Sequence, residues 1–405
     1  MSAIAETVPA IHDDQLAGRN AMVLAVSQAL AGGNNTVIVA TSSIIGAVLA
    51  PDPGLATLPI SVMVAGMWLA TLPVGILSKA YGRRFALQVG SVFGIVSGLI
   101  SCTAVLNGWF WLLLVGTFCG GLYASAHQSY RFAAADTASE RFRPKAVAWV
   151  LAGGVFGAVI GPQLVIFSKD LWPPYLFAAT FVAQSLCALL AAGVLILLKA
   201  PRPVAVEPFR GGRPLSEIVV QPRFIIAVVC GVASYMMMNL VMTSAPLAMV
   251  MCQHSVSDAA LGLQWHVIGM FAPSFITGNL IVRFGLWRIM ATGLFLLALA
   301  ATIGIVGTAL WNFWIGLTLL GIGWNFAFIG ATTLVTECHG PRERNKVQAF
   351  NDFLVFGAMA IGSFSSGQLL ANFGWTAVNA VVFPGVLVAA VLLAWGAFMR
   401  PPRPV

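Results

Sequence analysis

Residues 75–84 read Gly-Ile-Leu-Ser-Lys-Ala-Tyr-Gly-Arg-Arg, and residues 278–288 read Gly-Asn-Leu-Ile-Val-Arg-Phe-Gly-Leu-Trp-Arg. Both segments follow the pattern G-x-L-x-x-x-[YF]-G with an arginine after it. A second pair of segments, residues 143–149 and 344–350, shares the pattern R-x-K-x-x-A-aromatic. The members of each pair lie about half a chain length apart and in the same order. Several matches at nearly one spacing predict a duplicated unit.

The composition excludes a water-soluble globular protein. Hydrophobic residues make up 59% of the 405 residues and charged residues only 8%, whereas soluble domains carry about 25% charged residues. So few charges cannot cover a surface in water, and lipid is the expected solvent for most of the chain. The formal charge of +8 comes without a basic, aromatic-interleaved domain, so we expect no nucleic-acid partner.

Apolar runs long enough to cross a bilayer recur along the chain, since one crossing needs about 20 residues. They predict an all-α membrane protein with twelve transmembrane helices in two pseudo-symmetric halves of six. The runs cover residues 20–48, 57–77, 85–106, 110–134, 145–168, 174–198, 223–251, 259–282, 288–310, 313–336, 346–371 and 375–399.

These runs divide the chain into five parts. We expect a tail at 1–19, a first half at 20–198, a linker at 199–222, a second half at 223–399 and a tail at 400–405. The linker is rich in Pro, Gly and Arg, and a short amphipathic turn is expected around Leu215–Val220.

Lys and Arg fall almost entirely on one side of this arrangement. Lys169 is the one basic residue among 21 that lies in the connections on the side away from the termini. Because cytoplasmic loops carry an excess of Lys and Arg, we expect both termini in the cytoplasm and the chain in the inner membrane.

The segment at 75–84 resembles the loop between the second and third helices of the major facilitator superfamily. It matches both glycines of that motif, the leucine and the terminal Arg83 and Arg84, but Lys79 stands where the family has an aspartate. The glycine-rich stretch that ends in Gly157, Gly161 and Pro162 is similar to a motif of the antiporter branch. The resemblance implies secondary transport by alternating access, in which the two halves rock about a central site.

The resemblance also implies that the helices at 20–48, 110–134, 223–251 and 313–336 line a central cavity. Their polar and aromatic side chains are therefore the candidates for binding a substrate. They are Gln28, Asn34, Asn35, Tyr123, His127, Arg131, Asn239, Thr243, Trp324, Asn325 and Phe328. Hydrogen bonds between helices are the alternative function of the amides, and anchoring at the membrane interface is the alternative for Arg131.

These candidates offer amides, hydroxyls and aromatic faces and almost no acid, which favours a planar or amphipathic organic solute. A metal ion or polyamine would need carboxylates. The six cysteines form no pair or cluster with histidine, so we expect no metal site and no cofactor.

Charged residues near the ends of the helices are candidates for coupling and gating. Lys79 and Asp352 are expected to form a charge-reversed pair between the halves, with capping of its own helix as the alternative function of Asp352. Asp136, with Glu140, is expected to meet Arg283 in the other half. His127 is the candidate for a coupling proton, because its imidazole titrates near neutral pH. Gly157, Gly161 and Pro162 are expected to pack closely or to bend their helix.

Two directions of transport remain open from the sequence. Proton-coupled export of an amphipathic compound is favoured by the motif that ends at Pro162. Uptake of a small aromatic nutrient, such as a flavin-type vitamin, is favoured by the lack of an acid in 20–48. It is also favoured by Gly116, which stands where the antiporter branch tends to have an arginine.

The expected partners of a transporter are the solute, membrane lipid and, in the export hypothesis, a proton, with the chain a monomer. A membrane receptor derived from a transporter is the alternative from a different class of protein. An enzyme is not expected, because the histidines fall in separate segments and no nucleophile lies beside a base.

Overall fold

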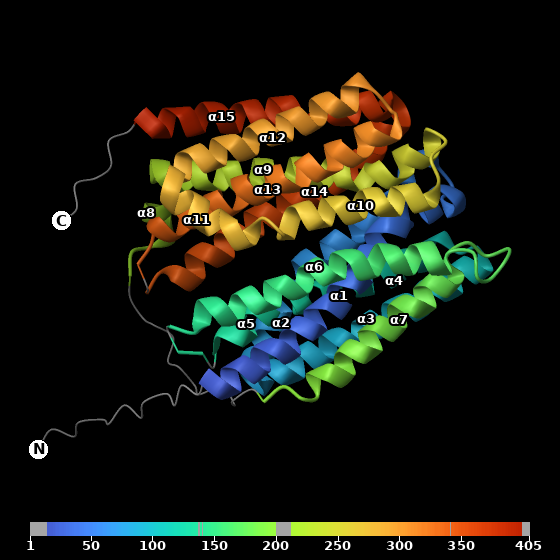
Figure 1. Ribbon diagram of the computed structural model, residues 1–405, viewed down its shortest axis with the longest axis horizontal. Helices are drawn as coiled ribbons and strands as arrows, with labels where there is room; N and C mark the ends of the chain where they lie inside the picture. The colour runs from blue at the N-terminus through green and yellow to red at the C-terminus, as the bar shows by residue number, and fades with distance from the viewer. Residues whose placement is uncertain (1–13, 137, 140, 200–211, 341, 399–405) are drawn as a thin grey trace, which may run out of the picture.

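The computed structural model describes residues 14–136, 138–139, 141–199, 212–340 and 342–398, and these residues form helices and loops without a strand. The long helices run roughly along one axis and gather into two bundles, one from each half of the chain (Figure 1). The described chain begins at Asp14 and ends at Phe398, and both of these residues lie at the same end of the molecule (Figure 1). We call this end the termini face and the opposite end the far face.

The first half contains a helix for each expected crossing. Its elements are α1 (Asp14–Leu49), the short η1 (Pro53–Leu55), α2 (Leu58–Tyr81), α3 (Arg83–Asn107), α4 (Phe110–Gln128), α5 (Tyr130–Asp136), α6 (Arg143–Ser168) and α7 (Ala178–Leu195). Helices α4 and α5 together make one span, Phe110–Asp136. Helix α1 begins at Asp14, inside the segment that was expected to be a tail.

The second half begins after a short helix in the linker, α8 (Leu215–Val219), at the position where a short turn was expected. Its other elements are α9 (Pro222–Met251), α10 (Val256–Phe271), α11 (Ser274–Phe284), α12 (Leu286–Val306), α13 (Leu310–Glu337), α14 (Arg344–Ala380) and α15 (Val382–Phe398).

Two irregular places explain how this half reaches six crossings. Helices α10 and α11 meet at a bend of 44° and together form one span. The apolar stretch Lys346–Phe398 has 53 residues, more than twice the roughly 20 residues of one crossing. It is interrupted at Gly374, where φ is 76°, and the chain then returns along α15 to the termini face (Figure 1). Ten helices qualify as crossings by length and hydropathy. The bent pair α10 and α11 adds one crossing, and dividing the 53-residue stretch at Gly374 adds another, which gives the predicted twelve.

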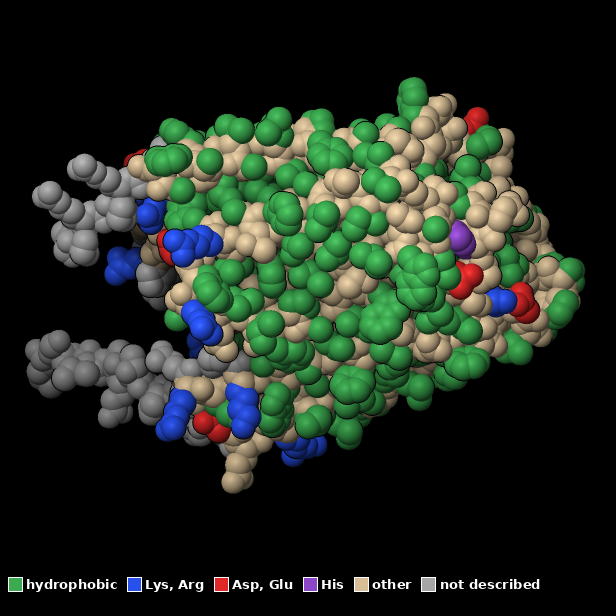
Figure 2. Space-filling view, turned by 45° about the horizontal axis from the view of Figure 1, so that its top comes forward, with side chains coloured by type: hydrophobic (Ala, Val, Ile, Leu, Met, Phe, Trp, Pro, Cys, Tyr) green, Lys and Arg blue, Asp and Glu red, His purple; other side chains and the backbone are tan. Residues whose placement is uncertain are grey.

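Hydrophobic and basic side chains occupy different parts of the surface. Figure 2 shows hydrophobic side chains over the middle of the molecule and most of the visible Lys and Arg side chains near the termini face. At that face Glu343, the residue before α14, binds the chain that leaves the linker, through Arg213 Nη2 at 2.9 Å. The Arg213 guanidinium and the backbone N–H groups of Gly340 and Arg213 hold the pKa of the Glu343 carboxyl well below its usual range.

Small residues set the closest packing of the first half, where α6 crosses α1. A Cβ atom added at Gly153 would lie 2.1 Å from the carbonyl oxygen of Ala25, and one at Gly161 would lie 2.6 Å from Cβ of Thr36. At Gly157 the added atom would lie 3.0 Å from Cα of Gly32. The glycines therefore let the two backbones touch, which is how helices associate in lipid.

We predict that Gly153→Val lowers the thermal stability of the protein in detergent, because its side chain would overlap the backbone of α1. Overpacking of this kind costs about 1–3 kcal/mol. Gly193→Val is the matched control, since a Cβ atom at Gly193 meets nothing within 4 Å. Equal melting temperatures for the two variants would show that α1 and α6 do not pack as described.

Candidate functional site

A cavity lies between the two halves, near the middle of the long axis. The space between its atoms is about 820 Å³, a figure that includes the open solvent at its mouth. Helices α1, α2, α4 and α6 of the first half and α9, α10 and α14 of the second half contribute to its wall. The lining residues are Gln28, Gly32, Asn35, Thr36, Val39, Met63, Val64, Met67, His127, Gln128, Gly154, Tyr235, Met238, Asn239, Met242, Leu263, Val267, Met270, Phe271 and Met359.

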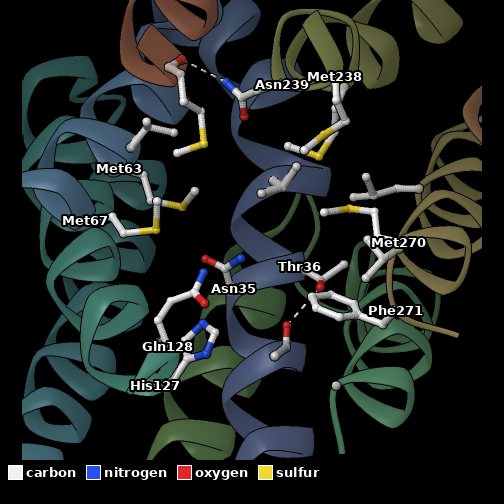
Figure 3. A pocket seen from close by; sticks show the side chains of 18 of the residues that line it. Asn35, Thr36, Met63, Met67, His127, Gln128, Met238, Asn239, Met270 and Phe271 are labelled. Carbon is white, nitrogen blue, oxygen red and sulfur yellow. Dashed lines mark hydrogen bonds between the residues drawn. The ribbon is translucent and has the colours of Figure 1, made fainter. Parts of the chain in front are cut away.

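One end of the cavity is polar. Gln28 and Asn35 of α1 meet His127 and Gln128 of α4 there, and Figure 3 shows the side chains of Asn35, Gln128 and His127 close together. Gln28 Nε2 lies 3.5 Å from His127 Nδ1. Two buried atoms at this end, Asn35 Oδ1 and His127 Nε2, have no hydrogen-bond partner among the described residues. Such atoms are costly to leave unpaired, so this end is suited to a polar ligand.

The rest of the cavity is rich in sulfur. Six methionines from four helices line it, namely Met63, Met67, Met238, Met242, Met270 and Met359. Figure 3 shows Met63 and Met67 on one side of the space and Met270 with Phe271 on the other. Methionine is flexible and polarizable and makes favourable contacts with aromatic rings. Lys, Arg, Asp and Glu are absent from the lining residues, so the cavity is suited to an uncharged solute with an aromatic part.

Four of the residues expected to bind a substrate line the cavity, namely Gln28, Asn35, His127 and Asn239. Asn239 donates from Nδ2 to the carbonyl oxygen of Met359 at 3.1 Å. That bond uses one side of the amide and joins α9 to α14.

Other expected residues are buried outside the cavity wall, where they stabilise contacts between helices. Asn34 donates to the carbonyl oxygen of Gln184 at 2.9 Å, and Asn325 donates to that of Met270 at 2.6 Å. The Thr243 hydroxyl lies 3.4 Å from that of Ser363. Tyr123 packs where Gly94 leaves room, since a Cβ atom there would lie 2.4 Å from the ring.

The aromatic residues of α13 lie behind the wall. Trp324 and Phe328 stack on each other at 5.2 Å between ring centroids, and both meet the edge or face of Tyr235, at 5.2 and 5.0 Å. Tyr235 itself lines the cavity. The two residues therefore support the wall through Tyr235.

Arg131 lies one turn beyond His127, toward the termini face. Its side chain is exposed, and its guanidinium lies over the Phe132 ring, 4.8 Å from the centroid. It is within electrostatic range of Asp352 and Tyr235 in the second half. It is not among the lining residues of the cavity.

The sequence analysis did not identify Gln128, Thr36 or the methionines of α2, α10 and α14 as cavity residues. The methionines carried one usable signal, because Met63 and Met67 are four residues apart and so share a helix face. Helices α2, α10 and α14 were not among the helices that the resemblance assigned to the cavity.

On the far-face side the cavity is closed by contacts between the halves. Ser61 of α2 and Ser363 of α14 have their hydroxyl oxygens 3.2 Å apart. Gln368 donates to the carbonyl oxygen of Gly54 at 2.9 Å. Gln163 of α6 donates to Gln264 of α10 at 2.9 Å. In the part of the chain that the structure describes, these are the hydrogen bonds that join one half to the other.

The charged gating candidates do not form the expected pairs in this conformation. Within the described residues Lys79 is exposed and has no ion-pair partner, and Asp352 accepts from Asn351 Nδ2 at 3.1 Å. Asp136 pairs with Arg83 of its own half at 2.8 Å, and not with Arg283. Arg84 is exposed. Glu140 lies outside the described residues.

Comparisons with known proteins agree with this architecture. The model of the Major Facilitator Superfamily matches residues 24–265 and 227–405. The riboflavin transporter RfnT of Brucella anthropi is 46% identical over 385 residues, which cover 94% of this chain and 96% of that protein. The uncharacterized MFS-type transporter YdeG of Bacillus subtilis is 27% identical, over 90% of this chain and 88% of that protein.

A solved structure has the same fold. The xylose transporter XylE from E. coli, in a partially occluded inward open conformation, superposes with a TM-score of 0.72 at 14% sequence identity. The match covers 95% of this chain and 98% of that chain. Together with the twelve crossings and the cavity between two halves, these matches mean that the chain belongs to the Major Facilitator Superfamily of membrane transporters.

Proposed function

We propose that this chain transports riboflavin or a closely related flavin. The observation that carries the proposal is the 46% identity to a riboflavin transporter over nearly the whole length of both proteins. The aligned region spans 94% of this chain, so it includes both halves and the helices that line the cavity.

The chemistry of the cavity supports the same solute. Riboflavin is a flat ring system with an apolar dimethylbenzene end, a polar pyrimidine end and an uncharged polyol chain. The cavity has a sulfur-rich part, a polar end built on Asn35, His127 and Gln128, and a wall without ionised side chains.

We propose uptake as the direction. Carboxylates are absent from the lining residues, so the cavity lacks the acid that commonly relays protons in membrane pumps and exporters. Downhill uptake of an uncharged solute needs no such group. The glycines that favoured export are engaged in packing α6 against α1, a function that is compatible with either direction. Proton coupling through His127 remains a prediction.

The distribution of basic residues supports an orientation with both termini in the cytoplasm of a cell bounded by an inner membrane. Lys and Arg gather at the termini face (Figure 2), which is typical of the cytoplasmic side. With this orientation the hydrogen bonds between Ser61 and Ser363 and between Gln368 and Gly54 close the outer side. The structure would then represent the state that faces the cytoplasm.

In the opposite state the termini face must close, and charged residues of the two halves are placed to close it. Asp352 of α14 is already within electrostatic range of Arg131 of α5, whereas Lys79 has no ion-pair partner among the described residues. We therefore expect Arg131, rather than Lys79, to pair with Asp352 when the halves rock together on this side. Arg83 and Asp136 are already paired within the first half.

We predict that proteoliposomes containing the protein and loaded with unlabelled riboflavin accumulate labelled riboflavin from outside. Counterflow requires only that the loaded carrier reorients, so it appears whether or not transport is coupled to protons. Repeating the assay with an imposed pH gradient shows whether protons drive accumulation. Export by proton exchange requires that the pH gradient drives accumulation.

Vesicles without protein are the control for leakage, and an unlabelled amphipathic cation serves as the competitor for the export hypothesis. The flavin proposal is contradicted if counterflow of riboflavin equals that of empty vesicles while the protein remains folded. Competition by the cation alone would favour export of amphipathic compounds.

We further predict that Arg131→Asp and Asp352→Arg each slow riboflavin counterflow and that the double variant recovers a large part of the rate. A loss of about tenfold corresponds to roughly 1.4 kcal/mol in the balance between two conformations. The matched comparison is Lys79→Asp with Asp352→Lys. Recovery in that double variant alone would assign the pair to Lys79, and recovery in neither would mean that Asp352 does not pair across the halves.

A further inference from the structure

Two unpaired atoms at the polar end of the cavity define what a ligand must present there. Asn35 Oδ1 is buried without a partner among the described residues, and so is His127 Nε2. His127 is only 7% exposed. Buried polar groups are nearly always paired in native proteins, which points to a ligand that supplies the missing bonds.

The hydrogen bond to the other ring nitrogen fixes the kind of bond that His127 can make. Gln28 Nε2 is a donor in every state, so His127 Nδ1, 3.5 Å away, must accept. A neutral imidazole has one N–H and one bare nitrogen. Its proton is therefore on Nε2, and the unpaired Nε2 is a buried donor on a residue that lines the cavity.

The neighbouring amides of Asn35 and Gln128 provide the other hydrogen-bonding groups at this end of the cavity. Asn35 Oδ1 can only accept. Gln128 lines the same end, its side chain makes no hydrogen bond to the described residues, and its amide offers an N–H donor. Figure 3 shows that the three side chains come from adjacent helices, α1 and α4, and converge. The polar end can thus supply donors from His127 and Gln128 and an acceptor from Asn35.

We infer that this end binds the cyclic imide edge of the solute, the group C(=O)–NH–C(=O). An imide presents one donor between two acceptors, which is the complement of His127 Nε2–H, Asn35 Oδ1 and the Gln128 amide. The flavin ring carries this group in its pyrimidine part, so the inference rests on the proposed function and adds an orientation to it. The imide lies against α1 and α4, and the dimethylbenzene end lies among the methionines of α2, α9 and α10.

The orientation explains why an uncharged site can be selective. The sulfur-rich wall accepts many aromatic surfaces, and shape alone discriminates weakly between similar rings. A site built to hydrogen-bond a donor rejects an analogue that lacks it, because the buried acceptor is then left unpaired. Asn35 Oδ1 is that acceptor, and it faces the imide N–H.

The test compares the binding of riboflavin and N3-methylriboflavin to the purified full-length protein, by quenching of flavin fluorescence. We expect methylation of the imide nitrogen to weaken binding to the wild-type protein by about tenfold or more, the effect of one lost hydrogen bond. In Asn35→Leu the affinity for riboflavin should fall by a similar factor, and the preference for riboflavin should disappear. Asn107→Leu is the control, because Asn107 is an exposed amide at the end of α3.

Each outcome has a distinct meaning. Equal binding of both flavins by the wild-type protein overturns the imide inference and leaves the flavin proposal intact. A preference that persists in Asn35→Leu also overturns the inference. Failure of the folded wild-type protein to bind riboflavin at all contradicts the flavin proposal itself. If Asn35→Leu does not fold, the wild-type comparison of the two flavins stands without any variant. Gln128→Leu, at a partly buried residue, should then weaken the binding of both flavins and leave the preference for riboflavin in place, because Gln128 donates to a carbonyl of the imide and not to its N–H.

Discussion

The contact between Ser61 and Ser363, whose hydroxyl oxygens are 3.2 Å apart, determines on which side the cavity is closed. It lies between α2 and α14, one of the helix pairs through which the two halves meet. Gln368 reinforces it through the carbonyl oxygen of Gly54. These bonds are few and join neutral groups, and each is worth about 0.5–1.5 kcal/mol. They can therefore hold the far face closed and still break when a bound solute favours the other state.

The interior of the molecule follows from the cost of charge in lipid. Lys, Arg, Asp and Glu are absent from the lining residues of the cavity, and most of the visible Lys and Arg side chains lie near the termini face (Figure 2). Specificity is left to a few neutral groups, of which Asn35 Oδ1 and His127 Nε2 are unpaired among the described residues. Six methionines provide a wall that can adapt to a ring. A site of this composition selects by hydrogen-bonding pattern and not by charge.

The sequence predicted the helices better than the wall of the cavity. Long apolar runs and the asymmetry of Lys and Arg define crossings and their order almost without tertiary information, because lipid imposes both. The wall depends on how each helix is rotated and tilted, which packing decides. Asn34 and Asn35 are neighbours, yet one bonds to Gln184 and the other faces the cavity. Met270 reaches the cavity from α10, which is followed by the bend to α11. No local sequence pattern predicts that Met270 lines the cavity.

The most direct measurement of the central claim traps the far-face contact. Ser61→Cys with Ser363→Cys places two thiols where the hydroxyl oxygens are 3.2 Å apart, close enough for a disulfide after a small movement. The account predicts that oxidation abolishes riboflavin counterflow in proteoliposomes, that a reductant restores it, and that neither single variant responds. Counterflow of riboflavin at an unchanged rate, with the cross-link shown to be complete, would contradict transport of a flavin by alternating access.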